Sequence, residues 1–220
     1  MSRPAVEVVL PKGGPTVVLA ELGATEVLLA LRAAGGHAND LAARLECVRA
    51  SLRRVNGTEV TPADVAGALL QKLVPRSRHH LQLCTAWGRI HEPDEEQIDA
   101  VKASVSIDVG EVESWTVTLP DGRRVTLVEQ PLETVGEALR AKAKNPSAQQ
   151  LQAALGALRR SVRAVDGRAV VAEELDGKGW DRLFSFRETL LLAVVWQDMQ
   201  VGDQEDLEAL GEAIRAGGTR

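Results

Sequence analysis

The chain has 220 residues, of which 45% are hydrophobic and 26% charged, and it carries a net charge of −5. The hydrophobic content argues against a disordered chain. The acidic balance argues against a nucleic-acid-binding protein, because affinity for phosphate depends on clustered lysines and arginines. The N-terminus lacks a signal-peptide pattern, and no segment approaches the roughly 18 apolar residues of a membrane span. The sequence therefore predicts a soluble protein with a cytoplasmic localisation.

The chain begins with a predicted β-hairpin over residues 6–21, VEVVLPKGGPTVVLAE, in which apolar and polar residues alternate on both sides of a glycine turn. We expect a first helix over 25–34 and a second, longer helix over 41–55. The second helix is predicted because four apolar residues recur at spacings that form one stripe along a helix. The stripe consists of Leu45, Val48, Leu52 and Val55.

A third helix is expected to begin at Thr61, because a threonine N-cap followed by Pro62 and Asp64 is typical of a helix start. The last main helix of this half is expected over 76–90. The segment HEPDEEQ at 91–97 has the residue types of a metal or acid–base cluster. A proline and acidic residues also suit the first turn of a short helix, and we favour that interpretation.

A second hairpin is predicted over 114–131, SWTVTLPDGRRVTLVEQP, because an Asp-Gly pair between alternating runs is a strong turn signal. The preceding segment 104–114 also alternates and is expected to extend the first strand of this hairpin. Helices are expected over 132–144 and 151–165, followed by a short extended piece and a third helix, and the last main helix is expected over 185–200. An acidic break and a final short helix end the chain.

The two halves of the chain match each other at a nearly constant offset. Leu10-Pro11 matches Leu119-Pro120 at an offset of 109 residues, and LAARLECVRASLRRVNG at 41–57 lies over LQAALGALRRSVRAVDG at 151–167. We therefore predict an α+β, mostly helical fold made of two tandem copies of a β-hairpin plus a helical cluster. The copies are assigned to residues 1–104 and 105–220. Their hairpins either pack on their own helices or join into one four-stranded sheet.

The sequence shows no catalytic constellation. Cys47 and Cys84 lie in apolar helical patterns and are interpreted as buried free thiols. His79 and His80 are adjacent on a helix, so their side chains diverge, and no second pair at a zinc spacing completes a site. The sequence predicts no metal, no cofactor and no enzymatic activity. The alternative is a small enzyme whose site lies between the copies, which a deep pocket of polar residues differing between the copies would favour.

Six residues at repeated places in the two copies are candidates for binding a protein partner. The arginines of the second helix form short basic ridges, which fit either a solvated helix face or a docking surface for an acidic partner. The recurring tryptophans fit either core anchors or interface hot spots. The candidates are Arg49, Arg53, Arg159, Arg163, Trp87 and Trp196.

The order of motifs resembles tail assembly chaperones and baseplate-hub assembly proteins of phage tails and contractile injection systems. The resemblance is clearest in VTLPDGRRVTLVE at 117–129, VDG at 165–167 and FSFRETLLLAVVWQDMQVGDQEDLEAL at 184–210. It implies a non-enzymatic protein that binds a tape-measure, hub or other tail component, with no nucleic-acid, membrane or small-molecule ligand. The alternative is a structural baseplate or tail component that is retained in the mature particle.

Overall fold

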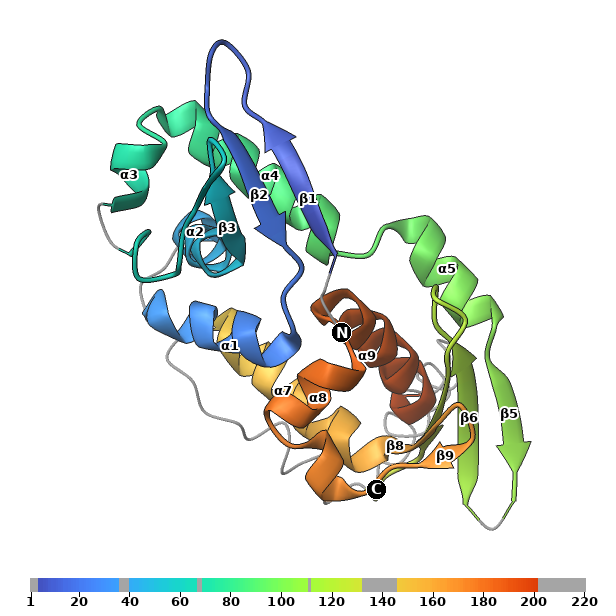
Figure 1. The fold of residues 1–220 in the computed structure, drawn as a ribbon. Helices are drawn as coiled ribbons and strands as arrows, with labels where there is room; N and C mark the ends of the chain where they lie inside the picture. The colour runs from blue at the N-terminus through green and yellow to red at the C-terminus, as the bar shows by residue number, and fades with distance from the viewer. Residues whose placement is uncertain (1–3, 36–39, 67–68, 111, 132–145, 202–220) are drawn as a thin grey trace, which may run out of the picture.

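The computed structural model describes residues 4–35, 40–66, 69–110, 112–131 and 146–201. It shows an α+β fold in which helix exceeds strand and each half of the chain forms its own antiparallel sheet (Figure 1). The predicted fold class is confirmed, and the two hairpins belong to separate sheets rather than to one shared sheet. No helix within these described ranges is long and apolar enough to cross a membrane.

The first half forms a four-stranded sheet in the order β1-β2-β3-β4, against which α2 and α4 pack. The predicted helices over 25–34 and 76–90 correspond to α1 and α4. The elements are β1 (Ala5–Val9), β2 (Thr16–Ala20), α1 (Ala24–Ala33), α2 (Asp40–Ser51), β3 (Leu52–Val55), β4 (Thr58–Glu59), α3 (Leu69–Leu73), α4 (Ser77–His91) and α5 (Glu95–Ala103).

The second half forms a five-stranded sheet in the order β5-β6-β7-β8-β9. The predicted helix over 185–200 corresponds to α9, whereas the helix expected over 132–144 and the final short helix lie outside the described residues. The elements are β5 (Ser106–Val109), β6 (Glu113–Thr118), β7 (Arg124–Val128), α7 (Pro146–Ser161), β8 (Val162–Val165), β9 (Arg168–Ala169), the 3-10 helix η1 (Ala172–Leu175), α8 (Lys178–Leu183) and α9 (Phe186–Val201).

The internal repeat is reproduced in the register of the strands. In the first hairpin Ala5 pairs with Ala20 and Val9 with Thr16. In the second hairpin Ser114 pairs with Val128 and Thr118 with Arg124, which are the equivalent positions at offsets of 109 and 108. Strands β1, β2, β3 and β4 are therefore the counterparts of β6, β7, β8 and β9.

The tight turns after β3 and β8 repeat an unusual backbone conformation. Asn56 and Asp166 have positive φ angles of 49° and 52°, and each is followed by a glycine with positive φ. Asn56 Oδ1 accepts a hydrogen bond from the Thr16 N–H at 3.0 Å, and Asp166 Oδ1 accepts one from the Arg124 N–H at 2.8 Å. Each turn is therefore tied to the start of the neighbouring hairpin strand in the same way.

The predicted helix over 41–55 is wrong in its last quarter, because α2 ends at Ser51 and Leu52–Val55 form β3. Val18 pairs with Arg54 and Leu19 with Leu52, which leaves Arg53 as the extra residue of a β-bulge. In a regular strand Leu52 and Val55 would face opposite sides of the sheet, but the bulge directs both into the core. Their spacing of three therefore imitates the spacing of a helix.

The same correction applies to the predicted helix over 151–165. Helix α7 ends at Ser161, and Val162–Val165 form β8. Thr126 pairs with Ala164 and Leu127 with Val162, so Arg163 is the extra residue of the second bulge.

Two further expectations differ from the structure, and one is confirmed. Residues 61–66 form turns rather than a helix start, although the Asp64 carboxylate accepts hydrogen bonds from the N–H and hydroxyl of Thr61. Segment 104–114 does not extend one strand but forms β5 and then turns back into β6. The segment HEPDEEQ is a helix start, because Asp94 caps α5 by accepting from the Gln97 N–H at 2.8 Å.

The two halves are joined by contacts that centre on α1 and on Leu22, two residues before it. Leu22 N–H donates to His91 Nε2 at 2.9 Å, and Leu22 C=O accepts from the Phe186 N–H at 3.0 Å. Helix α1 packs against α7, α8 and α9 of the second half. The buried apolar side chains of both halves consequently form one continuous core.

The repeated turn yields a test of stability. Asp166→Ala removes the acceptor for the Arg124 N–H and places a residue that disfavours positive φ in the turn. We expect it to lower the free energy of unfolding by about 1–2 kcal/mol, measured by urea denaturation. Asp166→Asn is the matched control, because Asn56 fills the same place in the first half, and it should stay within about 0.5 kcal/mol of the parent protein. Equal losses in both variants would contradict this account of the turn.

The buried thiols yield a second test. Both cysteines are free and buried, as the sequence predicts. Burial, together with the Glu46 carboxylate, raises the pKa of the Cys47 thiol to about 12, and burial also raises the pKa of Cys84. Near pH 8 only about one Cys47 in ten thousand is then a reactive thiolate. We expect both thiols to resist a thiol reagent in the folded protein and to react within minutes in urea. Fast labelling of Cys47 before unfolding would contradict its burial.

Candidate functional site

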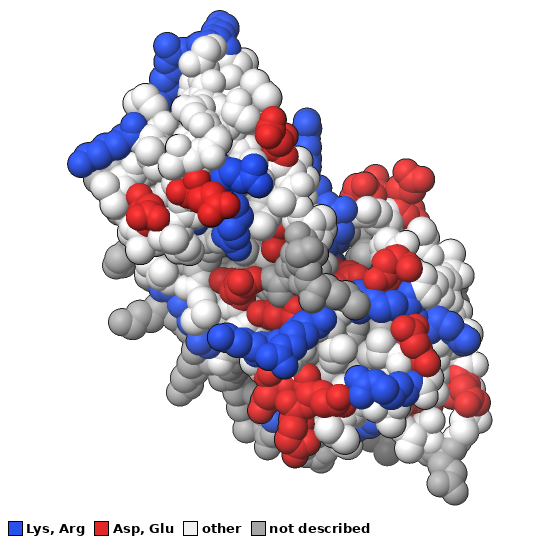
Figure 2. Space-filling view, viewed as in Figure 1, with Lys and Arg blue, Asp and Glu red and all other residues white. Residues whose placement is uncertain are grey.

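A groove of about 1520 Å³ runs between the two halves, and we call it the inter-half groove. Its first wall includes Ala5 and Ala20 at the base of the first hairpin, and Leu29 of α1. The opposite wall includes Asp121 at the tip of the second hairpin and Phe184, which directly follows α8. Figure 2 shows arginine, lysine and carboxylate side chains interspersed where the two halves meet. The groove therefore combines apolar contact area with charges of both signs.

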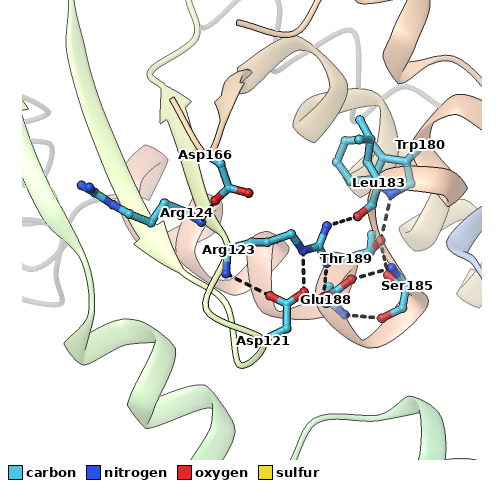
Figure 3. A network of polar contacts seen from close by, with 9 residues as sticks. All are labelled: Asp121, Arg123, Arg124, Asp166, Trp180, Leu183, Ser185, Glu188 and Thr189. Atoms are coloured by element: carbon cyan, nitrogen blue, oxygen red, sulfur yellow. Dashed lines mark hydrogen bonds and ion pairs between the residues drawn. The ribbon is translucent and has the colours of Figure 1, made fainter. Parts of the chain in front are cut away.

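Arg123 is the centre of a polar network on the second-half wall (Figure 3). Its Nε donates to Asp121 Oδ2 at 2.5 Å, its Nη2 donates to Glu188 Oε1 at 2.5 Å, and its Nη1 donates to the Leu183 carbonyl. The guanidinium also lies 5.8 Å from the ring centre of Phe184, within the range of a cation–π contact. One side chain thus ties the hairpin tip to the start of α9.

The charges around Arg123 reinforce its protonated form. Burial alone would lower the pKa of Arg123, but the hydrogen bonds and charges of Asp121 and Glu188 outweigh that effect and raise its pKa above the ordinary value. The guanidinium is therefore a fixed positive charge beside the groove at any ordinary pH.

The start of α9 is held by a capping box that shares Glu188 with this network. Glu188 Oε2 accepts from the Ser185 N–H at 2.7 Å, and Ser185 Oγ accepts from the Glu188 N–H at 3.3 Å. Thr189 Oγ1 donates to the Ser185 carbonyl and accepts from the buried Trp180 Nε1 at 2.9 Å. Hairpin, helix start and core are consequently one connected set of hydrogen bonds.

Four carboxylates of this region are engaged in structural bonds. Asp121 and Glu188 bind Arg123, and Asp166 accepts from a backbone N–H. Asp181 Oδ1 accepts from the Thr25 N–H at 3.0 Å, which links α8 to α1 across the two halves. Among the described residues no group of three or more His, Cys, Asp or Glu side chains is placed to hold a metal ion.

The first hairpin is anchored to α4 by different chemistry. His79 Nε2 lies 3.1 Å from the Pro11 carbonyl, and Arg76 Nη1 donates to the Lys12 carbonyl at 3.0 Å. A Cβ on Gly14 would lie 2.6 Å from the His79 ring, so only glycine fits there. His80 Nε2 instead faces the Val74 carbonyl at 2.6 Å. The two histidines therefore bind different carbonyls and do not converge.

The predicted arginine ridges do not lie on single helical faces. Arg49 and Arg159 are on helices α2 and α7, whereas Arg53 and Arg163 are the bulge residues of β3 and β8. Arg53 lines the inter-half groove, but Arg159 and Arg163 line a separate hollow of about 490 Å³. The prediction of one shared helical ridge in each copy is wrong, because the helix ends before the second arginine.

Arg53 and Arg163 have the same structural role in the two halves. Arg53 Nη1 donates to the Ala50 carbonyl at 2.7 Å and to the Leu52 carbonyl at 3.0 Å. Arg163 Nη1 donates in the same way to the carbonyls of Arg160 and Val162. A cationic side chain at the end of a helix satisfies terminal carbonyls and interacts favourably with the helix dipole.

The remaining candidates occupy different environments. Arg49 is half-buried and forms an ion pair with Glu46, and Arg159 is half-buried with Asp176 4.0 Å away. Trp87 is only 3% exposed, stacks on His91 with ring centres 4.4 Å apart, and lies 6.0 Å from the Phe186 ring of the second half. Trp196 is half-buried against the core. The Trp87 ring therefore joins the two halves inside the protein rather than facing a partner.

Sequence reasoning did not identify Arg123 and Glu188, the residues that shape the groove wall. The pattern Ser-x-x-Glu at 185–188 is a capping-box signal and could have located the start of α9. No local signal identifies Arg123, because its partners Leu183 and Glu188 lie 60 and 65 residues further along the chain.

Comparison of the chain with protein-family models, with curated proteins and with solved structures found no match.

The Arg123 network yields a test. Arg123→Ala leaves the Glu188 carboxylate and the Leu183 carbonyl without their cationic partner. We expect it to lower the free energy of unfolding by roughly 2–3 kcal/mol, because hydrogen bonds to charged groups contribute more than neutral ones. Arg124→Ala is the matched control, since that side chain is exposed and points away from the network in Figure 3. Equal stability of the two variants in chemical denaturation would contradict the role given to Arg123.

Proposed function

We propose that this protein is a non-enzymatic assembly protein that holds a segment of a partner protein in the inter-half groove. The resemblance to tail assembly chaperones makes a tape-measure or hub protein of a phage-tail-like or contractile injection particle the expected partner. The observation that carries the proposal is the groove itself, which is lined by residues of both halves and combines apolar side chains with charges of both signs.

The dimensions and chemistry of the groove favour a polypeptide over a small molecule. Its volume of about 1520 Å³ exceeds the roughly 300–1000 Å³ of ordinary small-molecule pockets. The lining includes Leu29, whose side chain is 59% exposed, together with charges of both signs such as Arg54 and Glu59. A peptide segment needs such a mixture, because its backbone requires polar partners while its side chains gain from apolar burial.

The enzyme alternative expects a pocket of differing polar residues at this place, and the groove is such a feature. The carboxylates of its second-half wall, however, bind Arg123 or the Thr25 N–H: Asp121 and Glu188 bind the guanidinium, and Asp181 binds the N–H. They hold the wall together rather than face a reacting group. We therefore favour binding over catalysis as the use of the groove.

Co-expression with candidate partners tests the proposal. The full chain should co-elute in size-exclusion chromatography with the tape-measure or hub protein of the same particle. Leu29→Asp should abolish co-elution, because Leu29 is 59% exposed within the groove. Leu41→Asp is the matched control, since Leu41 is 40% exposed outside the groove. Absence of co-elution with every tail component would overturn the proposal.

A second measurement distinguishes an assembly chaperone from a structural component of the mature particle. Mass spectrometry of purified particles should find no copies of a chaperone. A component retained in the mature particle would instead be present in a fixed ratio to the tube or baseplate proteins.

A further inference from the structure

Strand β1 ends its sheet, whereas its counterpart β6 does not. In the second half β5 pairs with the outer side of β6, from Ser106 opposite Thr116 to Val109 opposite Glu113. In the first half, among the described residues, no strand pairs with the outer side of β1. Because the two hairpins share one register, the second half shows what the outer edge of this hairpin can bind.

The alternation of hydrogen bonds identifies which groups of β1 face outwards. The Pro4 carbonyl accepts from the Glu21 N–H at 2.9 Å, and the Leu10 N–H donates to the Pro15 carbonyl at 3.2 Å. Since bonded positions alternate along an antiparallel strand, the three odd-numbered residues of β1 direct N–H and C=O away from β2. These are Ala5, Glu7 and Val9.

The second half confirms this direction. The matching residues of β6 are Ser114, Thr116 and Thr118. The Thr118 N–H donates outwards to Ser104 Oγ at 2.9 Å, just before β5. An exposed strand edge of this kind is a ready template for another strand.

Among the described residues, the helix beside the edge is also more exposed in the first half than in the second. In the second half α5 packs on β6 and on α9, the counterpart of α4. Leu190 of α9 is half-buried there, whereas Leu81 at the matching place of α4 is 53% exposed. Likewise Val117 of β6 is fully buried, whereas Val8 of β1 is only half-buried. Residues of α9 and β6, the two elements on which α5 packs, are thus more buried than their counterparts on α4 and β1.

The α4–β1 arrangement matches the α9–β6 arrangement at both ends of the helix. At the C-terminal end of α4, His91 Nε2 accepts from the Leu22 N–H. At the C-terminal end of α9, the side-chain amide oxygen of Gln200, when turned towards Gln130, accepts from the Gln130 N–H at 3.3 Å. At the other end each helix start is bonded to its hairpin tip, through His79 and through Glu188. Positions on α4 and α9 can therefore be compared directly.

One matched position differs in charge. Lys102 of α5 forms an ion pair with Asp198 of α9 at 2.8 Å. The position of α4 that matches Asp198 is Arg89, which is exposed. A segment seated on α4 as α5 is seated on α9 would therefore need a carboxylate at the place of Lys102.

We propose that the outer edge of β1 and the adjoining face of α4, the β1–α4 site, bind a short helix followed by an extended strand from a partner protein. The strand adds antiparallel to β1 as β5 adds to β6, and the helix carries a carboxylate opposite Arg89. A second copy of this chain fits less well, because two antiparallel β1 strands centred on each other would place two Glu7 carboxylates directly opposite. The inference rests on the proposed function only in taking a protein as the occupant.

A synthetic peptide with the sequence of residues 95–109, EEQIDAVKASVSIDV, is the natural probe, because this segment fills the equivalent place in the second half. Titrated into the full chain, the peptide with Lys102→Glu should bind roughly threefold to tenfold tighter than the unchanged peptide. The protein variant Arg89→Asp should reverse this order. Hydrogen exchange should show the amides of Glu7 and Val9 becoming protected when the peptide binds.

A proline substitution tests the strand contact separately. Glu7→Pro removes one outward N–H while leaving the ladder to β2 intact, so it should abolish peptide binding. Glu7→Thr is the matched control, because threonine occupies the equivalent position 116, and it should bind like the parent protein.

Several results would overturn the inference. Two concern the peptides: neither peptide binds, or Arg89→Asp does not reverse the preference between them. Two concern the strand edge: Glu7→Pro and Glu7→Thr bind the peptide equally, or the Glu7 and Val9 amides are already protected from exchange in the free monomeric chain. Dimerisation that protects the same amides would assign the edge to a second copy instead. Leu29→Asp should leave peptide binding unchanged. If the parent chain co-elutes with no tail component but still binds the peptide, the proposed function alone is refuted. If it co-elutes with a tail component but does not bind the peptide, this inference alone is refuted.

Discussion

The bulge in β3 and β8 is the constraint on which each half depends. The bulge adds one residue to the strand, so that two apolar side chains three positions apart both point into the core. It also places an arginine next to the end of the preceding helix. The side chains of Arg53 and Arg163 donate hydrogen bonds to backbone carbonyls in the last turn of the preceding helix. Helix and strand therefore follow each other directly, without a loop between them. The tight Asn-Gly or Asp-Gly turn then ties the corner to the hairpin. Helix, sheet and hairpin are therefore held at fixed angles by a few backbone contacts.

The halves are joined by a second set of backbone contacts, in which Leu22 occupies the centre. Its N–H is bound by His91 of its own half and its C=O by the N–H of Phe186 in the other. Because His91 Nδ1 lies 2.9 Å from the Trp87 carbonyl while Nε2 accepts from Leu22, this bonding pattern requires a neutral imidazole with its proton on Nδ1. Trp87 stacks on that ring and reaches Phe186. The shape of the inter-half groove thus depends on buried groups that lie outside it.

The sequence was sufficient for features that depend on local or repeated patterns. The constant offset identified the two copies, and the alternation around Asp121-Gly122 identified the second hairpin. The end of α2 could not be predicted, because the bulge exists only through pairing with β2, more than thirty residues earlier in the chain. The groove was equally hidden, because Arg123 and Glu188 meet only after the hairpin tip docks on α9. In the first case tertiary pairing overrode a valid local pattern, and in the second no local pattern identified Arg123.

The duplication also explains why the groove is not symmetric. Features shared by the copies, the bulge arginines and the turns, maintain the fold. Features that differ lie along the groove: it meets the base of the first hairpin at Ala5 and the tip of the second at Asp121. The outer strand edge is covered by β5 in one half and uncovered by any described strand in the other. A polypeptide bound in the groove would therefore contact different residues near the base of the first hairpin and near the tip of the second. If the proposed partner is an extended polypeptide, the groove therefore favours one direction of its chain over the other, which a symmetric pair of copies could not do.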